Sequence, residues 1–247
     1  MTEPVRSRWW PVVWIGAITM AIEAAVYAGV GVTGASSRTA ALATMAVATV
    51  WIALAVPIFA AGGRGAFDRF IRGGTVIDAT GAILCILWML CPQLGLLSAL
   101  KIYAVLASMG LAGIVAVCAA RSDRWQAIVA VMAAVVMVVA LTTPFWGNGI
   151  LVGLDGSARQ GAATGMVAVN PVFSMAAASA RDLHWVWNEA PRMYRTTVLG
   201  QIMPVPSVSW YVTPLIWLGL AGIAAVVALW RHGGATPAAP TDLPATP

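Results

Sequence analysis

Charged side chains are scarce in this sequence of 247 residues. Only 9% of the residues are Asp, Glu, Lys or Arg, whereas 60% are hydrophobic. Soluble domains carry about 25% charged residues, so this deficit excludes an ordinary soluble domain. A helix needs about 20 mostly apolar residues to cross the hydrocarbon core of a bilayer, and the sequence contains enough for six. We therefore predict an all-α, polytopic membrane protein with six transmembrane helices.

Residues that carry catalytic chemistry are equally rare. The only histidines are His184 and His232, and the three cysteines, Cys85, Cys91 and Cys118, all fall within apolar runs. No CxxC or Cys/His spacing indicates a metal site, and no GxSxG, HExxH or phosphate-binding glycine loop is present. We therefore predict no catalytic, cofactor-binding or metal-binding residues, and a protein that is not itself an enzyme.

The six apolar runs define the predicted spans and the domain. One membrane domain covers residues 1–232, and the Pro/Ala-rich residues 233–247 are predicted to be a disordered tail. The predicted spans are Trp9 to Val32, Thr39 to Ala61, Val76 to Ala99, Ile102 to Ala120, Gln126 to Phe145, and Tyr211 to Trp230. This assignment puts Asp78 near the mouth of the third span and Lys101 in a tight turn.

Basic residues lie at the ends of the predicted spans, which is the pattern of topology signals rather than of a nucleic-acid surface. The opposite side has only Arg38 and Lys101 in its short turns. Cytoplasmic loops carry the excess of Lys and Arg, so both termini are predicted to be cytoplasmic, in the cytoplasmic (inner) membrane. The basic residues assigned to the cytoplasmic side are Arg6, Arg8, Arg64, Arg69, Arg72, Arg121, Arg124 and Arg231.

Residues 62–74, with the sequence GGRGAFDRFIRGG, predict a short amphipathic helix on the cytoplasmic side. Phe67, Phe70 and Ile71 fall on one face at helical spacing, and charged residues occupy the other face. The glycine pairs at both ends are expected to terminate this helix. Such a helix either lies at the membrane surface or docks a partner, and a solvated connector is the alternative. The charged residues are Asp68, Arg69 and Arg72.

A long connection, residues 147–209, separates the last two spans and is predicted to face outward. Asn170 is a favourable helix cap and Pro171 is tolerated at the first helical position, so a short apolar helix is expected through Phe173 to about Arg181. Nine or ten residues are too few to cross a bilayer. They can dip into it and return, so we predict a re-entrant or interfacial helix.

Glu23 stands in the middle of the first span. An ionisable group inside the membrane is a functional-site hypothesis by default, because burial of its charge is expensive. The alternative is an uncharged glutamic acid that forms a hydrogen bond and packs against a neighbouring helix. Both interpretations remain open from the sequence.

Together, six spans with both ends inside, the helix at residues 62–74 and the outer short helices resemble the permease subunits of type-2 ABC transporters of the exporter-like class. The run NPVFSMAAASA followed by PRMYRTTVLGQ is similar to C-terminal segments of bacterial members. The resemblance implies a separate ATP-binding subunit docked on Phe67, Asp68, Arg69, Phe70 and Arg72, and a second permease copy or a related permease as partner. One departure is that only eight residues precede Trp9, where the family has an elbow helix.

Two functions therefore follow as the main expectations, and a structural or assembly membrane protein without transport is a third possibility. The first is a permease that moves a substrate through the membrane on ATP hydrolysed elsewhere, with membrane lipid around it and no nucleic acid. The alternative is a membrane subunit of an oxidoreductase or of another integral membrane enzyme complex. That alternative requires histidines or carboxylates that converge within the bilayer, and the sequence has only Glu23 to offer.

Overall fold

The computed structural model describes residues 6–120, 122–179, 182 and 208–233. The described residues form helices and turns and contain no strand, as the composition predicts. Four short helices follow α5 within the described residues: α6 (Thr143–Trp146), α7 (Asn148–Leu151), α8 (Gly156–Val169) and α9 (Pro171–Ser179). The long helices are α1 (Arg6–Val32), α2 (Ser37–Ala61), α3 (Ala66–Leu90), α4 (Leu96–Cys118), α5 (Asp123–Leu141) and α13 (Val212–Gly233).

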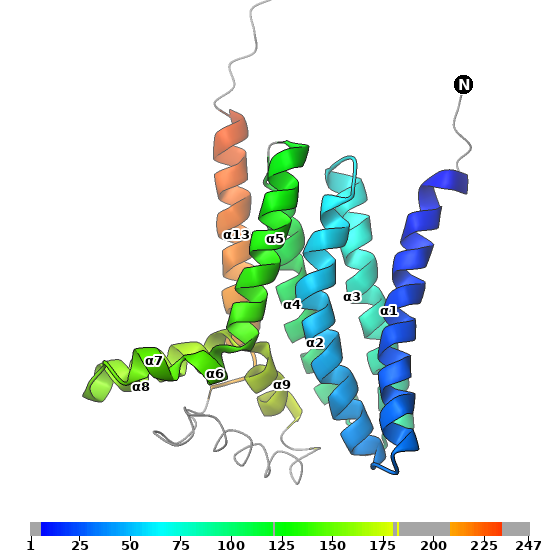
Figure 1. Cartoon of the computed structure of the whole chain (residues 1–247), viewed down its shortest axis with the longest axis vertical. Helices are drawn as coiled ribbons and strands as arrows, with labels where there is room; N and C mark the ends of the chain where they lie inside the picture. The colour runs from blue at the N-terminus through cyan, green and yellow to red at the C-terminus, as the bar shows by residue number, and fades with distance from the viewer. Residues whose placement is uncertain (1–5, 121, 180–181, 183–207, 234–247) are drawn as a thin grey trace, which may run out of the picture.

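The six long helices stand side by side in one bundle, with α1 and α13 on opposite flanks (Figure 1). The first turn of α1, the α2–α3 corner and the last turn of α13 all lie at the end drawn uppermost, called here the upper end. The short helices α6 to α9 lie at the opposite, lower end, and α6, α7 and α8 extend sideways from the bundle. The first and last described helices therefore have their outer ends on the same side of the bundle as the α2–α3 corner.

Each of the six long helices contains a stretch long and apolar enough to cross a membrane. The bent pair α8 and α9 would make a seventh if it counted as one span. Exposed aromatic side chains gather at both ends of the bundle, which is where aromatic belts meet the headgroups of a bilayer. Trp9 and Trp10 stand near the start of α1, Trp125 stands near the start of α5, Trp146 ends α6, and Tyr211 directly precedes α13. These features describe a multi-pass membrane protein.

The boundaries of the third and fourth spans differ from the prediction. The break lies at residues 91–95, and Lys101 is inside α4 rather than in a turn. Pro92 disfavours helical geometry in the residue before it, and Cys91 accordingly has a non-helical backbone with φ −116° and ψ 89°. Gly95 then begins α4. Cys91 and Leu94 are apolar, so in the sequence this turn looks like a continuing span, and in the structure both side chains are buried.

The helix predicted at residues 62–74 is not separate. Residues 66–74 form the first turns of α3, and the Gly73–Gly74 pair continues the helix instead of ending it. A Cβ atom on Gly73 would lie 2.6 Å from Cγ1 of Ile114, so this glycine permits close packing of α3 on α4. Gly110 does the same from α4, where a Cβ would lie 2.6 Å from Cδ1 of Ile77.

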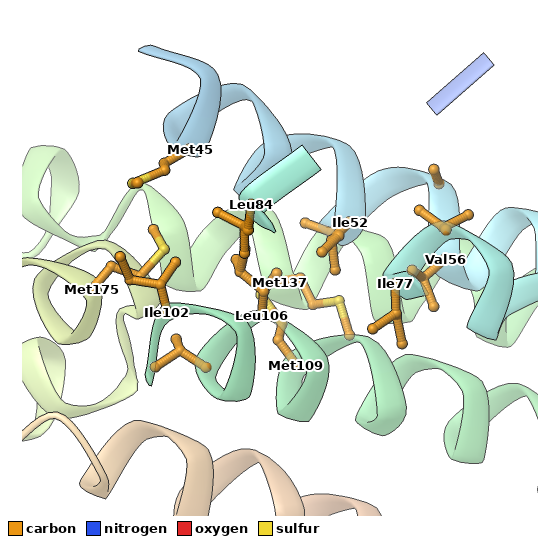
Figure 2. Packing of buried hydrophobic residues seen from close by; sticks show 14 of the residues in the cluster. Met45, Ile52, Val56, Ile77, Leu84, Ile102, Leu106, Met109, Met137 and Met175 are labelled. Carbon is orange, nitrogen blue, oxygen red and sulfur yellow. The ribbon is translucent and has the colours of Figure 1, made fainter. Parts of the chain in front are cut away.

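The core of the bundle lies between α2, α3, α4 and α5. Figure 2 shows Ile52 and Val56 of α2 and Ile77 and Leu84 of α3 close to the buried side chains of α4. Methionines fill gaps among these branched side chains, as their flexible thioethers allow. The methionines of this core are Met45, Met109, Met137 and Met175, and the last of them comes from α9. The short helix α9 is therefore packed into the same core as the long helices.

Candidate functional site

The α2–α3 corner is held in place by the carboxylate of Asp68. Its Oδ2 accepts a 2.9 Å hydrogen bond from the backbone N–H of Arg64. Its Oδ1 accepts one of 3.1 Å from Nε of Arg72, one turn further along α3, which also forms an ion pair. Asp68 stands in the first turn of α3, where the helix dipole stabilises a negative charge. Asp68 and Arg72 therefore stabilise the corner locally.

Arg69 was expected on the charged outer face of this segment, and that expectation is wrong. It is 9% exposed, and its Nε donates a 3.2 Å hydrogen bond to the backbone carbonyl of Gly63. A Cβ atom on Gly63 would lie 2.6 Å from the backbone nitrogen of Arg69, so only glycine fits there without movement of the backbone. Arg69 thus ties the end of α2 to the start of α3.

Phe67 and Phe70 are the exposed apolar residues of the corner. They stand three positions apart on α3 and are 76% and 52% exposed. Residues at this spacing lie on the same face of a helix, so the two rings form one apolar surface. Their backbone is anchored by the Asp68 and Arg69 contacts. The corner therefore presents two aromatic rings at the upper end of the bundle.

Glu23 is fully buried between α1 and α3. Its Oε1 accepts a 2.6 Å hydrogen bond from Oγ1 of Thr80, and its Oε2 has no hydrogen-bond partner among the described residues. Thr19, one turn earlier on α1, is also fully buried and accepts a 3.1 Å hydrogen bond from Nε1 of Trp51. Polar side chains thus join α1 to both α2 and α3 at this depth. This geometry favours an uncharged carboxyl, since no cation of the described chain pairs with it.

Asp78 is the functional candidate that the sequence interpretation placed wrongly. It lies at the midpoint of α3, whereas the expected span put it near a membrane surface. Its carboxylate is exposed on the outside of the bundle, and Oδ1 accepts a 3.4 Å hydrogen bond from the hydroxyl of Tyr103 on α4. The available signal was the helix-breaking Pro92, which moves the whole span towards the N-terminus.

At the lower end, Asn170 joins α8, α9 and α5. Its Oδ1 accepts a 2.9 Å hydrogen bond from the backbone of Val172, which confirms that it caps a helix beginning at Pro171. Its Nδ2 also donates a 3.0 Å hydrogen bond to the carbonyl of Leu141, near the end of α5. The sequence predicted the cap, but it had no signal for the second contact.

The bent pair is anchored to the bundle and not simply laid against it. Helices α8 and α9 meet at an angle of 78°. Oγ1 of Thr213 on α13 donates a 2.6 Å hydrogen bond to the carbonyl of Ala168, and Oγ of Ser98 on α4 donates one of 3.1 Å to that of Ala178. Phe173 packs against a small second core around Leu151. These contacts fit a re-entrant helix better than a free interfacial one. His184 and residues 234–247 lie outside the described residues.

Among the described residues, no group of three or more His, Cys, Asp or Glu side chains is arranged to hold a metal ion. No protein-family model matches the sequence, and no curated protein and no solved structure matches it either. Function is therefore argued from the arrangement of the helices and from the contacts described above.

Proposed function

We propose that this chain is the membrane-spanning permease subunit of an ABC-type transporter. It moves its substrate across the cytoplasmic membrane on ATP that a separate subunit hydrolyses at the upper, cytoplasmic end. A second copy of the chain, or a related permease, completes the translocation path. The chain itself contributes no catalytic residue to ATP hydrolysis.

The α2–α3 corner is the observation that carries this proposal. A subunit driven from outside needs a surface that binds its motor and is fixed to the transmembrane helices. Phe67 and Phe70 supply an exposed apolar surface, and the Asp68–Arg72 ion pair and the Arg69–Gly63 hydrogen bond hold the backbone beneath it. Buried aromatic residues tend to dominate binding at protein interfaces, at about 2 kcal/mol or more for a hot spot.

The arrangement at the other end supports the same proposal. A pair of short helices bent by 78° separates the last two long helices, and α9 reaches the core through Met175. Short helices that enter the bundle there are what the resemblance to type-2 permeases implies. The α2–α3 corner lies at the upper end of the bundle, together with the first turn of α1 and the last turn of α13. The bent pair lies at the lower end.

The experiment is purification of the tagged chain from its native membrane, with ATPase activity and an ATP-binding protein measured in the eluate. We expect both with the wild type and a loss of most of each with Phe67→Ala/Phe70→Ala. Trp125→Ala is the matched control, since Trp125 is an aromatic residue in the first turn of α5 and is 59% exposed. It should retain the ATPase.

Size-exclusion profiles and helical circular dichroism establish that the double variant is folded. Wild-type protein that carries no ATP-binding partner, or a folded double variant that retains its partner at the wild-type level, would overturn the permease proposal. Equal loss from Trp125→Ala would also count against it, because the effect would then be unspecific to the corner.

A further inference from the structure

We infer that a lateral groove between α3 and α4 is a binding site for an amphiphilic monovalent cation. This is a ligand with an ammonium or guanidinium head and an apolar body, taken up from the bilayer. The groove has a volume of about 260 Å³ and lies between the middle and the lower end of α3. The inference goes beyond the proposed permease function and does not depend on an ATPase.

The carboxylate of Asp78 determines that the ligand is positively charged. It lines the groove at the midpoint of α3 and forms no ion pair with any described residue. An exposed carboxylate is expensive at the depth of the hydrocarbon, and such groups mark ligand and ion paths. A positive charge beside it would offset that cost. A bound cation would therefore be stabilised beside the Asp78 carboxylate.

The remaining walls show which kind of cation fits. Inorganic divalent cations take six or more oxygen ligands, and the groove supplies one carboxylate and one phenol. The rings of Trp88 and Tyr103 line the same space, and aromatic faces attract organic cations. Leu84 and Ala99 form a buried floor, while Leu96 and Leu100 are about half exposed at the rim. An alkyl body would lie against these side chains.

Tyr103 is positioned for this role by Gly81. A Cβ atom on Gly81 would lie 2.7 Å from Cε2 of Tyr103, so the ring packs directly on the backbone of α3. This contact places the hydroxyl within 3.4 Å of Asp78 Oδ1 and keeps one side of the carboxylate bonded. Tyr103 is thus a positioning residue for the carboxylate and a wall of the site.

The test uses the full chain in nanodiscs of phosphatidylcholine, without nucleotide, and measures equilibrium binding of radiolabelled decyltrimethylammonium. Decyl sulfate and decanol, which have the same alkyl chain, serve as the anionic and neutral competitors. We expect Asp78→Asn to weaken binding of the cation by about tenfold or more, and Tyr103→Phe by less. Asp155→Asn, at an exposed carboxylate that directly precedes α8, should leave binding unchanged.

A second readout uses the wall of the groove itself. Cys85 lines the groove and is exposed, whereas Cys91 is buried. The cation should protect Cys85 from a membrane-permeant thiol reagent in the wild type, and decyl sulfate should not. This measurement needs no variant of Asp78.

Three results would overturn the inference. The first is equal binding by wild type and Asp78→Asn, and the second is equal competition by all three amphiphiles, which would indicate partition into lipid. The third is a disulfide-linked dimer that forms on oxidation in membranes and disappears in Cys85→Ser, since a second copy would then cover the groove. None of these results bears on the docking of an ATPase, so the two proposals fail separately.

Discussion

Thr80 donates a 2.6 Å hydrogen bond to Glu23 across the interface of α1 and α3, at a depth where both side chains are completely buried. Helix α1 contributes few other buried residues, namely Ile15 and Thr19 among those described in its long apolar stretch. In a bilayer, apolar surface offers little drive for helix association, and polar contacts of this kind contribute to it. Glu23 and Thr80 therefore help to hold a peripheral helix in place.

The Glu23 contact leads to a first prediction. Glu23→Gln keeps the acceptor for Thr80, so we expect a melting temperature and activity close to those of the wild type. Glu23→Leu removes the acceptor and should cost about 1–2 kcal/mol. Thermal unfolding in detergent compares the two variants. Loss of transport in a folded Gln variant would instead make the carboxyl functional.

Gly73 and Gly74 provide a matched pair for helix packing. Gly73→Ala should destabilise the protein by about 1–3 kcal/mol, because its Cβ would overlap Ile114 at 2.6 Å. A Cβ atom on Gly74 would meet nothing within 4 Å, so Gly74→Ala should be neutral or stabilise by up to about 1 kcal/mol through helix propensity. Equal melting temperatures for the two variants would contradict the close approach of α3 and α4.

A second glycine pair tests the corner. Gly63→Ala would bring a Cβ within 2.6 Å of the backbone of Arg69, whereas a Cβ on Gly65 would meet nothing within 4 Å. We expect Gly63→Ala to weaken retention of the ATPase and to lower stability by about 1–3 kcal/mol. Gly65→Ala should have little effect on either. Co-purification and thermal unfolding measure the two quantities, and a reversed order of the variants would refute the corner geometry.

Asn170 has two separable contacts. Asn170→Ser keeps a capping oxygen but loses the amide donor to Leu141, and should cost about 1 kcal/mol. Asn170→Ala loses both contacts and should cost about 2–3 kcal/mol. Unfolding in mixed detergent, followed by circular dichroism, ranks the variants. If the two substitutions cost the same, the cap contributes nothing measurable.

The orientation in the membrane is tested by single cysteines in a chain whose three native cysteines are replaced. Arg64→Cys, at the upper end, should react with an impermeant thiol reagent only after the cytoplasmic side is opened. Ser157→Cys, on the exposed surface of α8, should react in intact cells. Basic residues at the upper end motivate this expectation. The opposite labelling pattern would show that the α2–α3 corner faces away from the cytoplasm, and an ATP-binding subunit could then not dock there.

The fold class and the existence of six spans could be predicted because long apolar runs are an unambiguous signal of membrane helices. The Asn170 cap could also be predicted, since Asn is a favoured helix cap and Pro is favoured at the first helical position. The depth of Asp78 could not, because apolar residues hid the break near Pro92. The prediction that Gly73 and Gly74 end a helix was wrong, because glycine occurs both at helix ends and at close contacts between helices. The inward position of Arg69 depends on Gly63, six residues earlier, which periodicity does not reveal.

Helix α3 runs unbroken from the corner to the groove and contains no proline. At about 1.5 Å per residue, Phe67 and Asp78 are separated by roughly 17 Å along its axis. Because no break separates them, an axial displacement of the first turn of α3 would move Asp78 by a similar distance. Helix α3 therefore connects the surface formed by Phe67 and Phe70 to the groove at Asp78 as one continuous element.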